Sequence, residues 1–158
     1  MSRYLIVLNE WLIHDLLGEN ASDRQKESVK FLRMLITKCD KICVLKGSTW
    51  MKKAYQMMEQ SDPLIRRISK QLHLGILQDL DKAILLEKEE IKPLPEELTD
   101  KIPEDDQYLV QTYLSIKANF LITTDIRLKE TLSSFKEFRV KLRDEFLDEY
   151  LKEDNNLN

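Results

Sequence analysis

The stretch that decides the fold runs from Asp105 to Asp125 and reads DDQYLVQTYLSIKANFLITTD. It begins with two acidic residues before an amphipathic helical pattern, and it ends with a short apolar strand followed by an aspartate. An acid at a helix N-terminus and another after a strand can meet at one edge of an α/β sheet, where open α/β folds place their ligand sites. Because hard divalent cations prefer oxygen ligands, the two acids indicate a Mg²⁺ or Mn²⁺ site.

Strand-like and helix-like segments alternate along the chain, which is the pattern of a parallel α/β sheet. Besides the strand before Asp125, we expect strands at residues 4–8, 42–45, 83–86 and 138–142. The segment 83–86 could also continue a helix. Helices are expected at residues 11–17, from Ser22 onward, at 49–61 and at 64–72. Residues 88–103 contain three prolines among many acids, so they are predicted to form a surface connection.

Length and composition are typical of one compact domain. The chain has 158 residues, of which 42% are hydrophobic and 34% charged, as in soluble globular proteins. We expect a single domain over residues 1–153 and a frayed tail over 154–158. No apolar run approaches the length of a membrane span, so a cytoplasmic protein without a membrane partner is expected. The formal charge of -3 argues against a generally basic surface but leaves room for a local basic patch.

The cysteines carry little functional information. Cys39 and Cys43, together with His14 and His73, could in principle supply four zinc ligands. The histidines, however, are scattered and lack the spacing of a zinc finger. Two buried structural thiols in a reducing compartment are the preferred interpretation.

The same stretch resembles the corresponding part of the PIN-domain nucleases. In that family an aspartate opens a helix, an alanine-containing turn follows, and the next strand closes on a T-x-D motif, which here is Thr123-Thr124-Asp125. Both ends of the chain are similar to the family as well, with an apolar strand at 4–8 and a final strand at 138–142 that leads into an acidic helix. The resemblance implies a three-layer α/β/α PIN-like fold with a mainly parallel central sheet.

The resemblance also implies a set of site residues. In an active PIN nuclease, three or four carboxylates hold one or two divalent cations, which activate water for attack on a phosphodiester. Asp106 and Asp125, nineteen residues apart, are the implied catalytic metal ligands. Asn9 is a weaker third ligand because its amide oxygen carries no charge. Asp105 would replace Asp106 if the register were shifted by one residue, and either acid could instead serve only as a charge at the helix N-terminus.

The sequence departs from the family pattern at two positions. The first strand ends in Asn9 where the family has aspartate, and alternation along the strand is expected to aim Glu10 away from the site. The second family acid, on the helix after the second strand, corresponds to Lys53. A Lys53 ammonium between Asp106 and Asp125 would replace the metal with a buried ion pair. The alternative is that Lys53 is a solvated surface lysine.

Two further groups of residues could contribute to the site. Arg66, Arg67 and Lys70 belong to the densest basic stretch and could bind RNA phosphates, although a solvated basic helix face is the more frequent explanation. Thr123 and Thr124 could ligate a metal or orient a metal-bound water, and they are equally suitable as strand formers.

The sequence therefore predicts a divalent-metal-dependent endoribonuclease with a reduced acidic site. The alternative is a catalytically inactive PIN-like module that binds RNA or a protein partner. Mg²⁺ or Mn²⁺ as the cofactor, RNA as the substrate and a homodimer are all implied by the resemblance. A third interpretation, a toxin with a small antitoxin-like protein partner, rests only on how often small PIN domains have that role.

Overall fold

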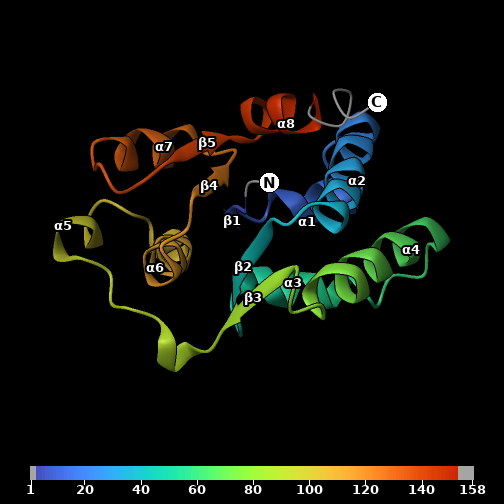
Figure 1. Ribbon diagram of the computed structural model, residues 1–158, viewed down its shortest axis with the longest axis horizontal. Coiled ribbons are helices and arrows are strands. Elements are labelled where there is room, and N and C mark those ends of the chain that lie inside the picture. The colour runs from blue at the N-terminus through green and yellow to red at the C-terminus, as the bar shows by residue number, and fades with distance from the viewer. Residues whose placement is uncertain (1–2, 153–158) are drawn as a thin grey trace.

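The computed structural model describes residues 3–152, and its central element is a five-stranded, all-parallel sheet (Figure 1). The strand order is β3-β2-β1-β4-β5. The strands are β1 Leu5–Leu8, β2 Lys41–Leu45, β3 Ala83–Leu86, β4 Phe120–Thr123 and β5 Val140–Leu142. The predicted α/β fold with a parallel central sheet is confirmed. Residues 83–86, for which the sequence allowed a strand or a helix, form an edge strand that pairs with β2.

Helices cover both faces of this sheet. They are α1 Trp11–Leu16, α2 Ser22–Thr37, α3 Thr49–Met57, α4 Pro63–Leu72, α5 Glu96–Thr99, α6 Gln107–Ile116, α7 Ile126–Ser133 and α8 Arg143–Lys152. Short helical segments are η1 His73–Leu77, η2 Lys88–Glu90 and η3 Glu104–Asp106. Residues 88–103 thus contain no long helix, as expected. The predicted tail 154–158 lies outside the described residues.

Two predicted boundaries are wrong for local reasons. The helix expected to reach residue 61 ends at Met57, because the next residues are exposed and Asp62 already caps α4. The Asp62 carboxylate accepts hydrogen bonds from the first free N–H groups of that helix, at 2.9 and 3.1 Å. The final strand begins at Val140 rather than at 138, since the N–H of Arg139 donates to the Tyr113 hydroxyl at 3.0 Å.

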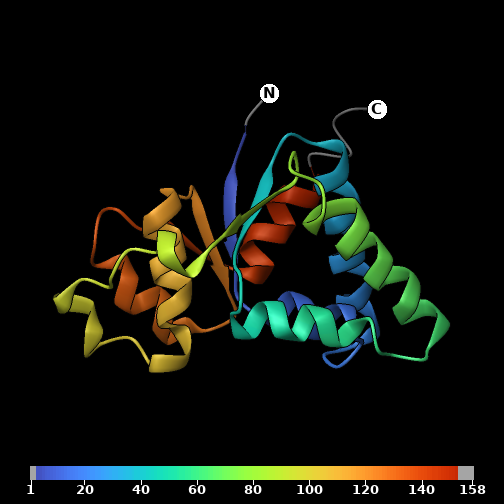
Figure 2. The ribbon, with the colours of Figure 1, turned by 90° about the horizontal axis from the view of Figure 1, so that it is seen from below.

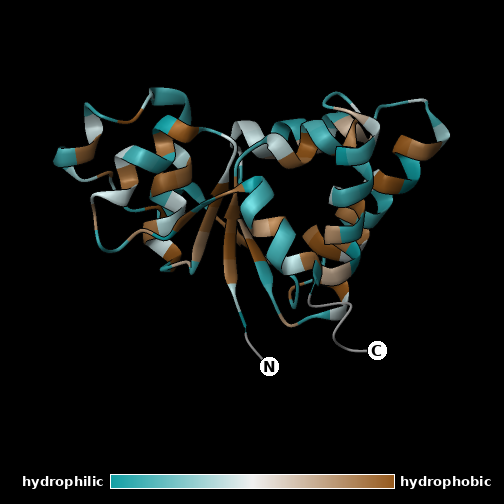
Figure 3. Ribbon diagram, turned by 90° about the horizontal axis from the view of Figure 1, so that it is seen from above, coloured by the Kyte–Doolittle hydropathy of each residue, from teal (hydrophilic) through white to brown (hydrophobic). Residues whose placement is uncertain are grey.

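The sheet separates two apolar cores, because successive side chains of a strand point to opposite faces. Ile6 and Leu8 of β1 belong to the core shared with α1, α2, α3, α4 and α8. Val7 belongs to the other core, which α5, α6 and α7 cover. Figure 2 shows these two helical layers on either side of the strands, and Figure 3 shows that the strands between them are apolar. The three-layer arrangement follows from this alternation.

The order of the strands reverses between β1 and β4. The chain passes outward from β1 to β2 and β3 and then returns to form β4 on the other side of β1. Leu8 is in register with Ile122, and the N–H of Asn9 donates to the carbonyl oxygen of Ile122 at 3.0 Å. Open α/β sheets bind ligands outside the carboxyl ends of the strands at such a reversal. The residues that follow β1 and β4 are therefore the first place to look for a site.

A buried ion pair joins three helices on one side of the sheet. Arg143 at the start of α8 contacts Asp15 of α1 at 2.7 Å, and the two side chains are only 2% and 0% exposed. The second partner of Asp15 is Ser28 of α2, whose hydroxyl donates at 2.8 Å, and a third is Asn20 at 2.6 Å. Because its oxygens are hydrogen-bonded on several sides, the buried carboxylate is stable only while these partners remain in place.

The described residues include no helix that is both long and apolar enough to cross a membrane.

Replacing Arg143 with methionine should destabilise the protein by about 3–5 kcal/mol, because Asp15 would remain buried without its cation. A matched control is Lys152→Met in the same helix, which removes an exposed pair with Asp148 at 3.2 Å. This control should cost less than about 0.5 kcal/mol. Urea unfolding measures both changes. Equal losses in the two variants would show that the buried pair contributes no more than a surface pair.

Candidate active site

Side-chain hydrogen bonds link the carboxyl ends of β1 and β4. The Asn9 amide nitrogen donates to the Thr123 hydroxyl at 3.0 Å, and the same hydroxyl accepts the N–H of Asp125 at 3.0 Å. The Asn9 amide oxygen accepts the N–H of Glu10. Thr123 is buried, whereas Thr124 is exposed. Thr123 therefore serves as the bridge between the two strand ends, and Asn9 is held in one orientation.

Asp125 has a structural function as well as a place at the sheet edge. One of its carboxylate oxygens accepts the N–H groups of Arg127 and Leu128, at 2.9 and 3.2 Å, and so caps α7. The other oxygen takes part in no hydrogen bond among residues 3–152. The carboxylate is thus oriented by the helix that it caps and keeps one oxygen for a ligand.

Asp106 lies at the junction of η3 and α6, and its side chain makes no capping hydrogen bond. Burial raises the pKa of this carboxyl, and the negative charges of Asp125 and Glu10 raise it further. Asp106 is half-buried, while its neighbour Asp105 is exposed. Of the three neighbouring carboxylates, Asp105 raises the pKa of Asp106 least. The structure therefore brings Asp106 and Asp125 into electrostatic contact with each other.

The predicted direction of Glu10 is wrong. Alternation along the first strand was expected to aim it away, but β1 ends at Leu8, and Glu10 is already the N-cap residue of α1. Its carboxylate accepts the hydroxyl of Tyr108 of α6 at 3.4 Å, and its charge acts on Asp106. The polar pair Asn9-Glu10 stands directly before the apolar helical pattern that begins at Trp11. This pair is the sequence signal that the strand has ended and that Glu10 belongs to the helix start.

The predicted position of Lys53 between the two aspartates is also wrong. Its ammonium lies 3.3 Å from the Glu10 carboxylate and 3.1 Å from Nε2 of His14. Within the part of the chain that the structure describes, Lys53 forms no ion pair with Asp106 or Asp125. The reason is geometric, since Glu10 and His14 lie one turn apart on α1 and both reach α3.

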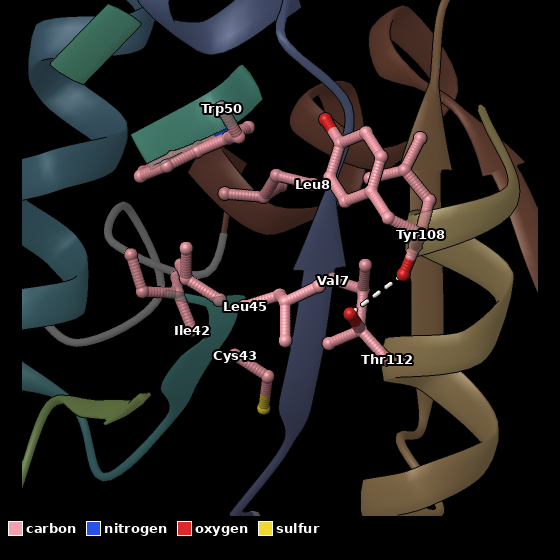
Figure 4. A pocket seen from close by; sticks show the side chains of 10 residues that line it. Val7, Leu8, Ile42, Cys43, Leu45, Trp50, Tyr108 and Thr112 are labelled. Carbon is pink, nitrogen blue, oxygen red and sulfur yellow. Dashed lines mark hydrogen bonds between the residues drawn. The ribbon is translucent and has the colours of Figure 1, made fainter. Parts of the chain in front are cut away.

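Tyr108 closes the inner side of this region. Figure 4 shows its ring beside the end of β1, near a cavity of about 10 Å³ that Val7, Cys43 and Trp50 also line. Such a volume suits about one water molecule. Burial and the neighbouring charge of Glu10 raise the pKa of Tyr108, so its hydroxyl keeps its proton and donates.

The cysteines and histidines do not gather into a metal site. Burial raises the pKa of Cys43 to about 12, so it stays a thiol, and Cys39 is half-buried rather than buried as expected. The ring of His73 contacts the carbonyl oxygen of Ala54 at 2.6 Å, on the α3 and α4 side of the molecule. Over residues 3–152, no group of three or more His, Cys, Asp or Glu residues could hold a metal ion.

The predicted RNA-binding residues lie apart from the acidic edge. Arg66, Arg67 and Lys70 are exposed on α4, which Figures 1 and 2 place at the outer side of the molecule. They line two surface hollows with volumes of about 310 and 480 Å³, and Lys70 borders both. The structure therefore has a basic surface on α4 and an acidic region at the ends of β1 and β4.

A scan against models of known protein families found no match for this chain, and searches among curated proteins and solved structures found none.

Replacing Asp106 with asparagine should stabilise the metal-free protein near neutral pH, because the natural carboxylate is held among negative charges. The pKa of Asp106 lies above its ordinary value of 3.8, so between these two values the folded state binds more protons than the unfolded state. The natural protein therefore loses stability as the pH rises from about 4 through the raised pKa, while the variant lacks this loss.

Denaturant unfolding in the presence of a chelator, from about pH 4 to about pH 7.5, measures this difference. Asp105→Asn is the matched control and should give a smaller gain, since that carboxylate is exposed. If Asp106→Asn is no more stable than the natural protein at neutral pH, burial and the neighbouring charges do not destabilise the Asp106 carboxylate.

Proposed function

We propose that this protein is a PIN-like endoribonuclease that depends on one divalent cation, Mg²⁺ or Mn²⁺. The observation that supports this most is the pair Asp106 and Asp125, two carboxylates that act on each other at the reversal of strand order. Neither has a cationic side-chain partner among the described residues. RNA as the substrate comes from the resemblance in sequence.

The donor set suits a single hard cation. Two carboxylates and the amide oxygen of Asn9 provide three oxygen ligands, which is the chemistry that Mg²⁺ prefers, with water completing the shell. The two negative charges balance one divalent cation. Glu10 is turned toward Lys53 and Tyr108, so it adds to the local field instead of completing a second metal position.

The residues of the site then have separate roles. When bound, the cation would supply a Lewis acid that activates water for attack on a phosphodiester. Asp106 and Asp125 would hold it, and Asn9 with Thr123 would keep the two strand ends at a fixed separation. Arg66, Arg67 and Lys70 are the proposed contacts for phosphates further along the RNA. The expected homodimer and antitoxin-like partner stay predictions from the resemblance.

Calorimetric titration of Mn²⁺ into the metal-free protein tests the proposal. The natural protein should bind, and Asp106→Asn or Asp125→Asn should weaken binding by roughly 100-fold or more, because each removes one charged ligand. Asp105→Asn should bind as the natural protein does. Cleavage of a single-stranded RNA pool should follow the same order. Absence of Mn²⁺ binding in the natural protein would refute the proposed enzyme.

A second candidate is a PIN-like module that binds RNA or a protein without cleaving. The ion pair between Lys53 and Glu10 favours it, because this pair neutralises one acid at the site. The absence of a group of three His, Cys, Asp or Glu ligands over residues 3–152 agrees with it.

If the protein is the module that binds without cleaving, the natural protein lacks Mn²⁺ binding. Asn9→Asp combined with Lys53→Glu should then create it, since the change adds two acids and releases Glu10 from its ion pair. The control combines Asn9→Asp with Lys52→Glu, because Lys52 is the exposed neighbour on the same helix. Calorimetry should detect binding only in the first double variant. Equal Mn²⁺ affinities of the two double variants would argue against the idea that Lys53 stands in for a metal ion.

A further inference from the structure

Five polar side chains form a continuous chain of contacts beside the two aspartates. His14 Nδ1 lies 2.5 Å from the Glu19 carboxylate, and His14 Nε2 lies 3.1 Å from the Lys53 ammonium. Lys53 continues to Glu10 at 3.3 Å, and Glu10 accepts the Tyr108 hydroxyl at 3.4 Å. The chain joins α1, α3 and α6.

The chemistry of the neighbouring groups supports one assignment of donors and acceptors in this chain of contacts. A carboxylate only accepts hydrogen bonds and an ammonium only donates them. We assign the His14 proton to Nδ1, where Glu19 accepts it, and this tautomer leaves the lone pair of Nε2 to accept from Lys53. The Tyr108 hydroxyl donates to the Glu10 carboxylate. In this assignment, the His14 ring holds Lys53 from one side and the Glu10 carboxylate holds it from the other.

Lys53 retains binding capacity after these contacts. An ammonium has three N–H donors, and Glu10 and His14 accept two of them. Its side chain is 31% exposed, so part of it is accessible to a ligand. Over the described residues, Lys53 is the one cation in an ion pair with any of the three acids that act on one another, Glu10, Asp106 and Asp125.

We propose that Lys53 binds a phosphate oxygen of the substrate at this site, and that His14 and Glu19 are the residues that position it. This inference rests on the proposed function, because it concerns how the same site receives a phosphodiester. A phosphate that approaches Asp106 and Asp125 is repelled unless a cation stands beside them, and a charge-assisted hydrogen bond from an ammonium supplies the attraction. A lysine side chain is flexible, so two fixed acceptors reduce the entropy that it loses on binding.

The first measurement is the tautomer of His14 by long-range proton–nitrogen NMR at a pH where the ring is neutral. The chain has only two histidines, so the signals are readily assigned. The natural protein should show the proton on Nδ1, and Glu19→Leu, which removes the acceptor, should shift the population toward Nε2–H, which cannot accept from Lys53. A proton on Nε2 in the natural protein would overturn the positioning role.

The second measurement is the affinity for the dinucleotide UpU, which has one phosphodiester. Amide NMR spectra recorded in the presence of a chelator monitor the binding. Lys53→Met should weaken binding by roughly tenfold or more, while Lys52→Met on the exposed face of the same helix should not. His14→Leu should weaken binding, and His14→Gln, which retains an acceptor, should restore part of it. The amide spectra also establish that each variant is folded.

The outcomes separate this inference from the proposed enzyme. Mn²⁺ binding with UpU affinity unchanged in Lys53→Met would leave the metal site standing and overturn the phosphate role of Lys53. UpU binding that depends on Lys53, without any Mn²⁺ binding, would support the phosphate role of Lys53 and overturn the metal site. A natural protein that does not bind UpU, or binds phosphate-free uridine equally well, would also overturn the role of Lys53.

Discussion

The reversal of strand order between β1 and β4 is the constraint on which the rest of the structure depends. Because all five strands are parallel, their carboxyl ends share one edge, and the reversal puts the exits of β1 and β4 side by side. The carbonyl oxygen of Ile122 accepts both the Asn9 N–H and the Trp11 indole N–H, each at 3.0 Å. This double contact turns the chain into α1 at once, and so it directs Glu10 toward α6 rather than along the strand.

Helix α1 connects the stability of the fold to the geometry of the site. Its residue Asp15 is held in the interior by Arg143, while Glu10 and His14 on another face meet Lys53 of α3. A rotation of α1 that moved the half-buried side chains of Glu10 and His14 would also break the buried pair. The buried charges therefore set the rotation of the helix, and the rotation sets where the site lysine lies. In this sense a contact remote from the acidic edge determines its electrostatics.

Much of the fold could be predicted from the sequence, because short apolar runs and helical periodicity are local signals. The strands and most helices follow from them, whereas a shared site for Asn9 and Asp125 was implied only by the family resemblance. Partners that lie far apart along the chain could not be found this way. The resemblance predicts Lys53 between Asp106 and Asp125, yet its contacts are Glu10 and His14 on another part of the chain. The pairing of Asp15 with Arg143 spans almost the whole chain and leaves no local pattern.

The charges at the acidic edge divide into two parts with different properties. Glu10 and Lys53 form a pair whose charges cancel, so this pair neither attracts nor needs a further cation. Asp106 and Asp125 have no such compensation, and the pKa of Asp106 is raised by burial and then by the negative charges of Asp125 and Glu10. A lysine placed between the aspartates would have lowered that pKa instead. The two aspartates therefore suit the proposed single divalent cation, and the ammonium of Lys53, held by Glu10 and His14, is the cation that we propose for the negative charge of a phosphodiester.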